Sequence, residues 1–287
     1  MTGSKVYELI EKSPLLPHLP ENICQTLTLL NNPIETDIDL LIEKVAQSDE
    51  LINLMLKNIN TGYFRLKREI KTIKEAVVYL GMKTVQNLLI FHIIQKLFPD
   101  GDEKRNRIFD MHMYWKHVLG TAVASCMVSE RIKKGDKFKL FSYGLLHDIG
   151  LIIMDICLPD HTDKVIEKLY KGVHQLVAER IVLGGITHSE IGAWICRKWN
   201  IRDDIINIVE NHHTPLLAKR ETEDVKILYV GDMISSEYYQ RLLGLHQNLD
   251  MNRQITESLG LTDEDIREMA EEFPQALAQA LNYLSVY

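Results

Sequence analysis

The stretch GLLHDIGLIIMD, residues 144–155, sets a histidine and an aspartate inside an apolar run. Leucine and isoleucine flank His147 and Asp148 on both sides, and such side chains belong in a protein core. Burying a polar or charged group without a partner costs several kcal/mol. The stretch therefore predicts that other parts of the chain supply polar partners to these two residues inside the core.

The composition around this stretch is typical of a globular protein. Of the 287 residues, 46% are hydrophobic and 25% are charged, and the formal net charge of −7 disfavours nucleic acid or an anionic membrane as a partner. The longest apolar stretches are about ten residues, against roughly 20 for a membrane span. The first residues, MTGSKVYELIEKSP, lack a secretory hydrophobic region. Four scattered cysteines indicate neither a disulfide framework nor a thiolate zinc site. We therefore expect a cytoplasmic protein without a membrane span.

The spacing of apolar residues predicts an all-α fold. Glycine and proline are scarce, and apolar residues recur every three or four positions without a convincing strand pattern. Helices are expected over 21–31, 37–47, 50–58 and 73–98, the last broken near Gly81.

Three parts are expected along the chain. The polar stretch FPDGDEKRNR, residues 98–107, predicts a junction between two helical blocks. The first block covers residues 1–104 and packs on a second helical bundle over residues 105–243. A short helical tail covers residues 244–287, in which Thr262 caps a helix with Asp265 in its first turn and Pro274 interrupts it.

Five of the eleven histidines fall where the apolar stripe of a helix is expected. In THSEIGAWICRKW, residues 187–199, Thr187 and Glu190 form a capping-box pattern, which places His188 in the first turn of a helix. In VKILYVGDMISS, residues 225–236, Asp232 follows an apolar run on a mostly buried helix. The inward-facing polar residues are His117, His147, Asp148, His188, His212, His213 and Asp232.

Metal binding is the interpretation that satisfies these seven residues together. One histidine on an apolar face is more often a hydrogen-bonded core residue, but five imidazoles and two carboxylates in one interior need shared partners. His147 and Asp148, one helical step apart, can serve one ion or two neighbouring ions. Mixed imidazole and carboxylate ligands suit iron, manganese, cobalt or zinc. Seven ligands exceed one tetrahedral site, which favours two divalent metal ions that share a bridging carboxylate.

The order H, HD, H, HH, D along the chain resembles the HD superfamily of metal-dependent phosphohydrolases, in which an all-α bundle holds one or two metals. The N-terminal half narrows this resemblance. Residues 15–32 and 48–90 look like the first half of the HDOD family, the HD-related output domain of bacteria. AVVYLGMKTVQNL, residues 76–88, and HSEIGAWICRKWNI, residues 188–201, are especially similar to that family. The resemblance spans residues 15–240 and leaves the tail outside.

The resemblance implies a regulatory protein. Residues 1–104 then correspond to the N-terminal HDOD subdomain and residues 105–243 to the HD-type metal-binding bundle. HDOD proteins are regarded as signalling output modules, and many have lost metal ligands, whereas this chain keeps all seven positions. We expect a bacterial signal-transduction protein whose metal is structural or vestigial, whose output is a contact with a protein partner, and which needs no catalysis. A homodimer and a phosphate-containing ligand are further options.

The alternative is a metal-dependent phosphohydrolase acting on a nucleotide, a cyclic dinucleotide or another phosphate ester. Two ions would activate a water molecule, and an aspartate could serve as the base, with Asp148 as the first candidate. Cations that could meet the phosphates are Lys116, Arg197, Lys198 and Lys219. Two departures weaken this alternative, because Leu151 stands where cyclic-dinucleotide phosphodiesterases carry a lysine, and HHTPLLAKRE, residues 212–221, lacks their Gly-Tyr-Pro signature.

A third interpretation is nucleic-acid binding through TGYFRLKREIKTIKE, residues 61–75. Basic residues beside Tyr63 and Phe64 could grip a phosphate backbone and stack on bases. The same stretch resembles a structural turn between helices of the HDOD family, and the protein is acidic overall. Nucleic acid is therefore the least favoured partner.

Overall fold

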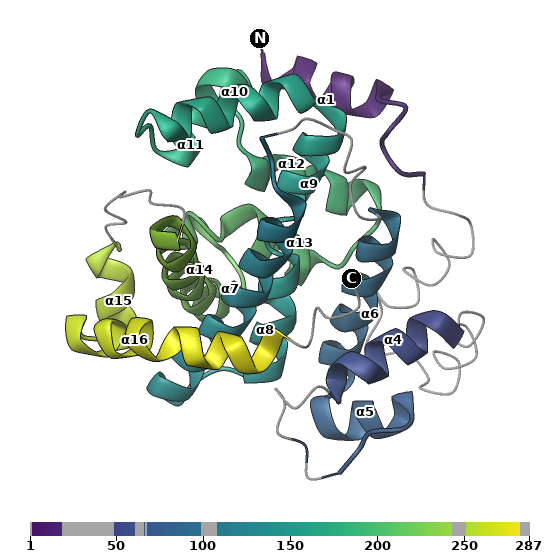
Figure 1. Ribbon diagram of the computed structural model, residues 1–287, viewed down its shortest axis with the longest axis vertical. Coiled ribbons are helices and arrows are strands. Elements are labelled where there is room, and N and C mark those ends of the chain that lie inside the picture. The colour runs from purple at the N-terminus through teal and green to yellow at the C-terminus, as the bar shows by residue number, and fades with distance from the viewer. Residues whose placement is uncertain are drawn as a thin grey trace.

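Every regular element in the described part of the chain is helical, as the spacing predicts. The computed structural model describes residues 2–18, 49–60, 66, 68–98, 108–242 and 251–281, and within these ranges no strand occurs. The helices predicted over 21–31 and 37–47, and nearly all of the predicted junction over 98–107, lie outside them. The helices, shown in Figure 1, are α1 (Gly3–Lys12), α4 (Asp49–Ile59), α5 (Ile73–Leu80), α6 (Met82–Leu97), α7 (Met111–Ile132), α8 (Lys137–Leu146), α9 (Ile149–Cys157), α10 (Pro159–Tyr170), α11 (Gln175–Val182), α12 (His188–Lys198), α13 (Asp203–Asn211), the 3-10 helix η1 (Pro215–Leu217), α14 (Thr222–Leu242), α15 (Arg253–Leu259) and α16 (Asp263–Ala280).

The break predicted near Gly81 is confirmed. Gly81 separates α5 from α6 with φ 83° and ψ 151°, a backbone conformation that L-residues rarely adopt. Thr72 caps the start of α5, and its side chain accepts the N–H of Glu75. The helix predicted over 50–58 is also present, as α4.

α1 is a helix that the sequence analysis did not predict. Its Val6 and Ile10 stand one helical turn apart and are both fully buried. The helix packs against α9, which follows His147 and Asp148, the pair that we call the HD motif. α1 therefore covers the C-terminal side of the HD motif. A two-residue apolar pair is too short a pattern to indicate a helix before its packing partner is known.

α16 confirms the predicted cap and corrects the predicted interruption. The Thr262 side chain accepts the N–H of Asp265 at 3.1 Å, and the Asp265 carboxylate accepts the N–H of Thr262 at 2.9 Å. Pro274 does not end the helix, because α16 continues through it to Ala280. Phe273 and Leu277, on either side of the proline, are both buried, and α16 packs on α7. This packing outweighs the hydrogen bond that proline cannot make.

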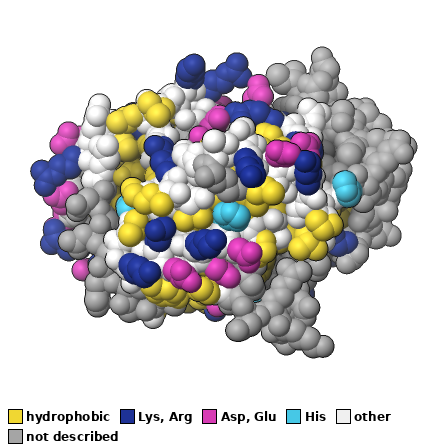
Figure 2. Space-filling model, turned by 90° about the horizontal axis from the view of Figure 1, so that it is seen from above, with side chains coloured by type: hydrophobic (Ala, Val, Ile, Leu, Met, Phe, Trp, Pro, Cys, Tyr) yellow, Lys and Arg dark blue, Asp and Glu magenta, His cyan; other side chains and the backbone are white. Residues whose placement is uncertain are grey.

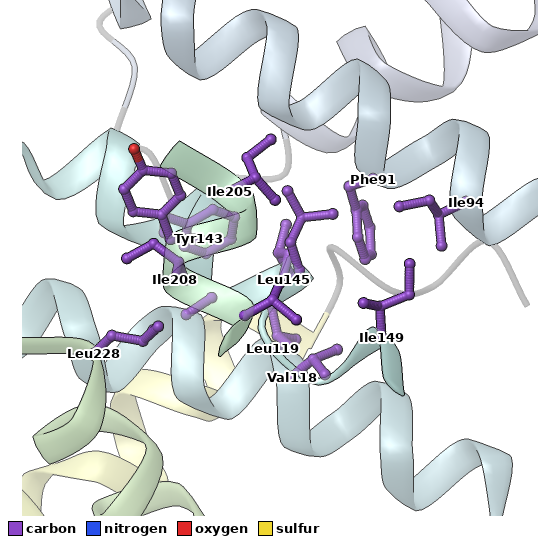
Figure 3. Close-up of a cluster of buried hydrophobic side chains, with 14 of the residues drawn as sticks. Phe91, Ile94, Val118, Leu119, Tyr143, Leu145, Ile149, Ile205, Ile208 and Leu228 are labelled. Atoms are coloured by element: carbon purple, nitrogen blue, oxygen red, sulfur yellow. The ribbon is translucent and has the colours of Figure 1, made fainter. Parts of the chain in front are cut away.

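α7 is the central helix of the second bundle, with α8 and α14 packed closely against it (Figure 1). A Cβ on Gly144 of α8 would lie 2.4 Å from Cα of Ala122, so only glycine permits this approach. A Cβ on Gly231 of α14 would lie 2.4 Å from Oγ of Ser125. Figure 3 shows the apolar core around α7, to which α6, α8, α9, α13 and α14 all contribute. This packing brings the C-terminal end of α8 close to the middle of α7 and of α14.

A buried polar network joins α6 of the N-terminal block to the bundle. The guanidinium of Arg202 donates to Gln86 at 2.7 Å and to Asn87 at 2.5 Å. It also forms two hydrogen bonds of 3.0 Å with Asp204, which accepts a further hydrogen bond of 2.7 Å from Tyr143 of α8. Such bidentate pairing satisfies a charge that burial would otherwise penalise. α6 is thereby fixed against α8, one helical turn before the HD motif.

One segment, Lys137–Cys157, is long and apolar enough to cross a membrane by length and composition, which the sequence analysis did not expect. It comprises α8, the HD motif and α9. Of its most apolar window, 83% is buried inside the protein. The apolar side chains of this segment therefore form the core of the bundle.

Candidate metal centre

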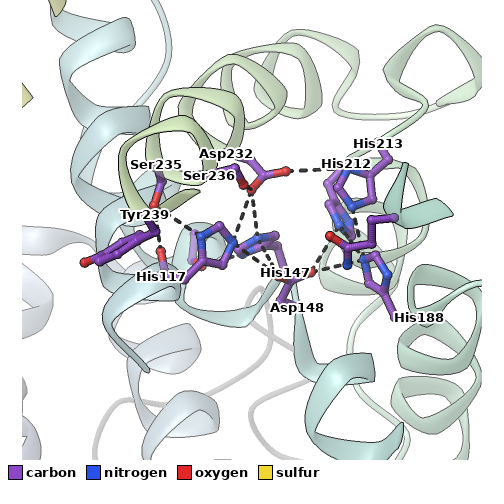
Figure 4. A network of polar contacts seen from close by, with 12 residues as sticks. His117, His147, Asp148, His188, His212, His213, Asp232, Ser235, Ser236 and Tyr239 are labelled. Atoms are coloured by element: carbon purple, nitrogen blue, oxygen red, sulfur yellow. Dashed lines mark hydrogen bonds and ion pairs between the residues drawn. The ribbon is translucent and has the colours of Figure 1, made fainter. Parts of the chain in front are cut away.

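The structure brings all seven predicted residues into one cluster inside the second bundle (Figure 4). Six helices contribute, and five of the seven residues stand at or next to helix ends, where side chains can converge without a helix lying between them. His117 is on α7, His147 and Asp148 lie between α8 and α9, His188 begins α12, His212 and His213 follow α13, and Asp232 is on α14. Their role as metal ligands stays a prediction.

The HD motif itself is a break between two helices. Asp148 has φ −101° and ψ 19°, so α8 ends before it and α9 begins after it. The two residues are therefore not one helical step apart, as the sequence analysis assumed. Gly150 sets the direction of α9, because a Cβ at this position would lie 1.9 Å from the carbonyl oxygen of His188. This approach between α9 and α12 brings Asp148 to His188.

Asp148 divides the cluster into two halves. Its Oδ2 lies 3.3 Å from Nε2 of His117 and 3.4 Å from Nε2 of His147. Its Oδ1 lies 3.2 Å from Nε2 of His188 and 3.3 Å from Nε2 of His212. Each oxygen of Asp148 thus faces the Nε2 atoms of two histidines, one pair in each half of the cluster.

Asp232 and His213 complete the two halves. Oδ1 of Asp232 lies 3.2 Å from Nε2 of His117 and 3.7 Å from Nε2 of His147. Nε2 of His213 lies 3.1 Å from Nε2 of His188, while its Nδ1 lies 3.5 Å from Oδ2 of Asp232. We define subsite A as His117, His147, Asp148 and Asp232, and subsite B as Asp148, His188, His212 and His213.

These distances match the coordination sphere of a metal ion. Ligand atoms at about 2.0–2.2 Å from one ion stand about 3.0–3.5 Å from each other in octahedral or tetrahedral geometry. The nitrogen and oxygen atoms within subsite A, and those within subsite B, lie mostly in this range. Each half of the cluster therefore has the size of one ion with its ligands.

The hydrogen bonds behind the imidazoles point the Nε2 lone pairs into the cluster. Nδ1 of His147 donates to the carbonyl of Gly144 at 2.7 Å, and Nδ1 of His212 donates to the carbonyl of Val209 at 2.8 Å. Since these acceptors keep the proton on Nδ1, Nε2 is free to bind a cation. Among the residues that the structure describes, no hydrogen-bond partner lies at the buried atoms Nε2 of His147 and Oδ1 of Asp148. The arrangement fits a divalent ion in each subsite.

Protons hold the cluster together in the absence of metal. Burial lowers the pKa of His147, but the Asp148 carboxylate outweighs burial and raises it to about 10. Glu179 likewise overcomes burial at His188 and raises its pKa to about 10. Burial lowers the pKa of His212 and His213. Despite burial, the neighbouring histidines hold the pKa of Asp148 and Asp232 well below the ordinary range.

The raised pKa values of His147 and His188 predict that metal binding strengthens with pH. The protons on His147 and His188 stabilise the folded metal-free protein fully below the unfolded imidazole pKa of about 6.5, and this contribution is lost as pH rises through about 10. Each ion must displace one of these protons, from His147 in subsite A or from His188 in subsite B. The affinity of each subsite should therefore rise by up to about tenfold per pH unit between about pH 7 and 9. Calorimetry in buffers of different ionisation enthalpy measures the released protons, and a flat pH profile would contradict the prediction.

Glu179 is a residue that the sequence analysis missed. It lies on α11, fully buried, and its Oε1 accepts from Nδ1 of His188 at 2.7 Å while its Oε2 accepts the N–H of His188 at 2.9 Å. Gln175 donates to the same carboxylate at 3.0 Å. A carboxylate behind a metal-binding histidine fixes the ring and raises its basicity. In the sequence, the only indication of this role is a glutamate on one face of a short helix. Such a pattern does not distinguish a buried partner of a histidine from an exposed residue.

Replacing Glu179 by glutamine should weaken metal binding at subsite B by about 10- to 100-fold. The amide keeps the shape of the side chain but removes the negative charge that supports His188. Competition against a fluorescent chelator measures the affinity. Glu167→Gln, an exposed position on α10, is the matched control and should leave the affinity unchanged. Equal affinity in both variants would show that Glu179 only fills space.

The cations predicted to meet a phosphate lie on the surface. Arg197 pairs with Glu210 at 2.6 Å, and Lys198 pairs with Glu11 and lies 5.5 Å from the ring centre of Trp194. Lys116 and Lys219 are exposed. Among the basic residues of the proposed nucleic-acid segment, Arg68 approaches Glu75 at 4.0 Å and Lys71 approaches Glu69 at 4.0 Å. Most of that segment lies outside the described residues.

Comparison with known proteins agrees with this fold. The model of the HDOD domain family matches residues 16–215. An uncharacterised protein of Treponema pallidum is 24% identical over 203 residues, which make up 69% of this chain and 37% of that protein. This chain therefore spans well under half the length of that relative.

Solved structures resemble the whole described fold. A protein from Shewanella amazonensis, provisionally named a phosphohydrolase, has a TM-score of 0.71 at 21% identity, with 97% of this chain and 96% of that chain covered. An HDOD domain protein of unknown function from Geobacter sulfurreducens has a TM-score of 0.70 at 20% identity, with coverage of 98% and 97%. A provisionally named signal transduction protein from Marinobacter aquaeolei has a TM-score of 0.71 at 18% identity, with coverage of 97% and 64%. At these identities the likeness shows the fold alone.

The fold and the buried histidine–aspartate cluster define an all-α protein of the HD type. Because the family model covers most of the chain, the protein belongs to the HDOD domain family, as the sequence resemblance predicted.

Proposed function

We propose that this chain holds two divalent metal ions, one in each subsite, and acts as a regulatory output domain through contact with a protein partner. The single observation that carries the metal part is Asp148, whose two oxygens face different groups of imidazoles at 3.2–3.4 Å. The ions would join the ends of α8, α9, α12 and α13 to α7 and α14. Their main effect is then to fix the arrangement of these helices.

Burial supports a structural role for the cluster. The side chains of His147, His188 and His212 have no exposed surface, and the other two histidines, His117 and His213, are 17% and 21% exposed. Ligands this deeply placed offer little room for a large substrate. The regulatory role is also the one that the HDOD resemblance implies.

Metal analysis tests the proposal. We expect about two equivalents of metal per chain when the protein is purified without chelator. With free metal at about 100 times the dissociation constant, each bound ion contributes about 2.7 kcal/mol of stability, and this contribution should be lost when the metal is removed. Elemental analysis and thermal melting before and after chelation measure both quantities. Full stability without metal, or occupancy below one equivalent after reloading, would contradict the proposal.

A second candidate is hydrolysis of a phosphate ester. The shared carboxylate between two subsites favours it, because a pair of divalent ions supplies Lewis-acid stabilisation and lowers the pKa of water. In this chain Asp148 would hold the two subsites in register, and the partly exposed His117 and His213 would form the edge that a phosphate reaches. Leu151 removes the lysine expected in cyclic-dinucleotide phosphodiesterases.

A substrate screen separates the two candidates. The manganese- or iron-loaded protein is assayed with bis(p-nitrophenyl) phosphate, nucleotides and cyclic dinucleotides, beside an Asp148→Ala control. Turnover that disappears in the control would support hydrolysis and overturn the purely regulatory role. No turnover across the panel, with metal content confirmed, would count against hydrolysis.

A further inference from the structure

A row of basic side chains lies on one face of α10, away from the metal centre. His161, Lys164, Lys168 and Lys171 follow the spacing of three and four that places residues on one side of a helix. They line a groove of about 340 Å³ together with Glu167 and Val182. Within the described ranges, none of the three lysines forms an ion pair. The groove therefore carries an unbalanced positive charge in a protein of net charge −7.

Exposed apolar side chains lie on α11, the helix that supplies Val182 to this groove, and at the end of α10. On α11, Val177 and Ile181 stand one turn apart and are 50% and 60% exposed, and Tyr170 at the end of α10 is 62% exposed. α10 and α11 pack against each other. α10 and α11 lie at the top of Figure 1, and Figure 2 shows the molecule from above. Basic and hydrophobic side chains are interspersed on this face. Surfaces that combine exposed apolar residues with one sign of charge commonly mark interaction sites.

We propose that the α10–α11 face docks an acidic amphipathic segment of a partner protein. Acidic side chains of the segment would pair with Lys164, Lys168 and Lys171, while its apolar side would cover Val177 and Ile181. Charge complementarity of this kind guides association and specificity. Nucleic acid is the poorer fit, since it would leave the exposed apolar side chains of α11 without apolar contacts. An anionic bilayer is also a poorer fit, because the basic residues line a concave groove and the molecule as a whole is acidic.

α11 links this face to the metal centre. Glu179 lies between Val177 and Ile181 in sequence but points inward, where it is fully buried and holds His188 at 2.7 Å. A partner that shifts α11 would move the carboxylate that supports subsite B. This coupling rests on the proposed function, whereas docking itself does not. Because coupling between two binding sites is reciprocal, metal occupancy should change partner affinity by the same factor.

A designed peptide tests the docking. The probe is a fluorescein-labelled helix of about 18 residues, or five turns, with glutamates on one face and leucines on the other. Its control carries lysine in place of every glutamate. Anisotropy on the full chain should show micromolar binding of the acidic peptide and at least tenfold weaker binding of the basic one. Lys164→Glu combined with Lys168→Glu should weaken binding about tenfold, and Val177→Ser with Ile181→Ser about fivefold.

Matched controls separate charge from position. Lys133→Glu combined with Lys219→Glu makes the same change in net charge at exposed residues outside α10 and α11, and should keep affinity within twofold. Equal effects of the two double variants would overturn the docking proposal. So would equal affinity for the two peptides, or preferential binding of phosphatidylglycerol vesicles or duplex DNA over the acidic peptide.

The same titration is repeated on metal-loaded and metal-stripped protein, with metal content measured on each sample. An affinity difference of at least threefold that disappears in Glu179→Gln supports the coupling. Identical affinities in samples of confirmed metal content overturn the coupling. Samples that never bind metal instead contradict the proposed function, so the two failures are distinguishable.

Discussion

Replacing Asp148 by alanine is expected to empty both subsites at once, lowering the metal content from about two equivalents per chain to near zero. The reason is geometric, since Oδ2 of Asp148 faces His117 and His147 while Oδ1 faces His188 and His212. Loss of this side chain removes a ligand from each subsite and also the negative charge between them. Elemental analysis of the purified variant, reloaded with manganese or iron, measures the result.

Single-subsite variants are the controls for this prediction. His117→Ala removes a ligand from subsite A alone and should keep about one equivalent in subsite B. His213→Ala, whose Nε2 lies near His188, should keep about one equivalent in subsite A. If Asp148→Ala retained one equivalent, as these controls should, the bridging role of Asp148 would be wrong.

Replacing Gly150 by alanine should destabilise the protein by about 3 kcal/mol or more, at or above the upper end of ordinary overpacking costs. The new Cβ would lie 1.9 Å from the carbonyl oxygen of His188 and 2.9 Å from the backbone nitrogen of Gly192. Both obstacles are backbone atoms, which cannot rotate away. α9 and α12 must therefore separate, and the melting temperature should fall by about 6–12 °C.

The melting temperature is compared in chelator, so that lost metal binding does not contribute. Gly172→Ala is the control, because Gly172 has φ 79° and open space around it. This control should cost about 1 kcal/mol through backbone strain and leave metal binding intact. Gly150→Ala should in addition weaken subsite B, because Asp148 moves away from His188 and His212. If Gly150→Ala melted at the same temperature as Gly172→Ala, α9 and α12 would be able to separate without loss of stability, and the prediction would be wrong.

The sequence was sufficient to predict where the cluster forms, because helical spacing decides which side chains face a core. His117 and Asp232 stand on the inner stripes of α7 and α14, and the capping box of Thr187 and Glu190 fixed the start of α12 beside His188. Periodicity is a local property, so these predictions needed no knowledge of tertiary contacts.

The rest depended on contacts between helices that are distant in the chain. Glu179 becomes recognisable only when α11 packs beside the start of α12, and the break at Asp148 follows from the close approach that Gly150 permits. α1 and the continuous helix through Pro274 were missed for the same reason, because buried contacts with α9 and α7 overrode weak local signals. Sequence also left open which aspartate bridges the two subsites.

The unequal distribution of carboxylates has a consequence for how the centre loads. In subsite A, oxygens of both Asp148 and Asp232 face imidazole Nε2 atoms, whereas in subsite B only an oxygen of Asp148 does so. Asp232 reaches subsite B only at Nδ1 of His213, and Glu179 lies behind the His188 ring. Coulomb attraction therefore favours filling A before B, and the first ion reduces the attraction felt by the second. Titration with metal should show two separated steps. A cell with scarce metal would hold the half-loaded protein, and one with abundant metal the fully loaded form.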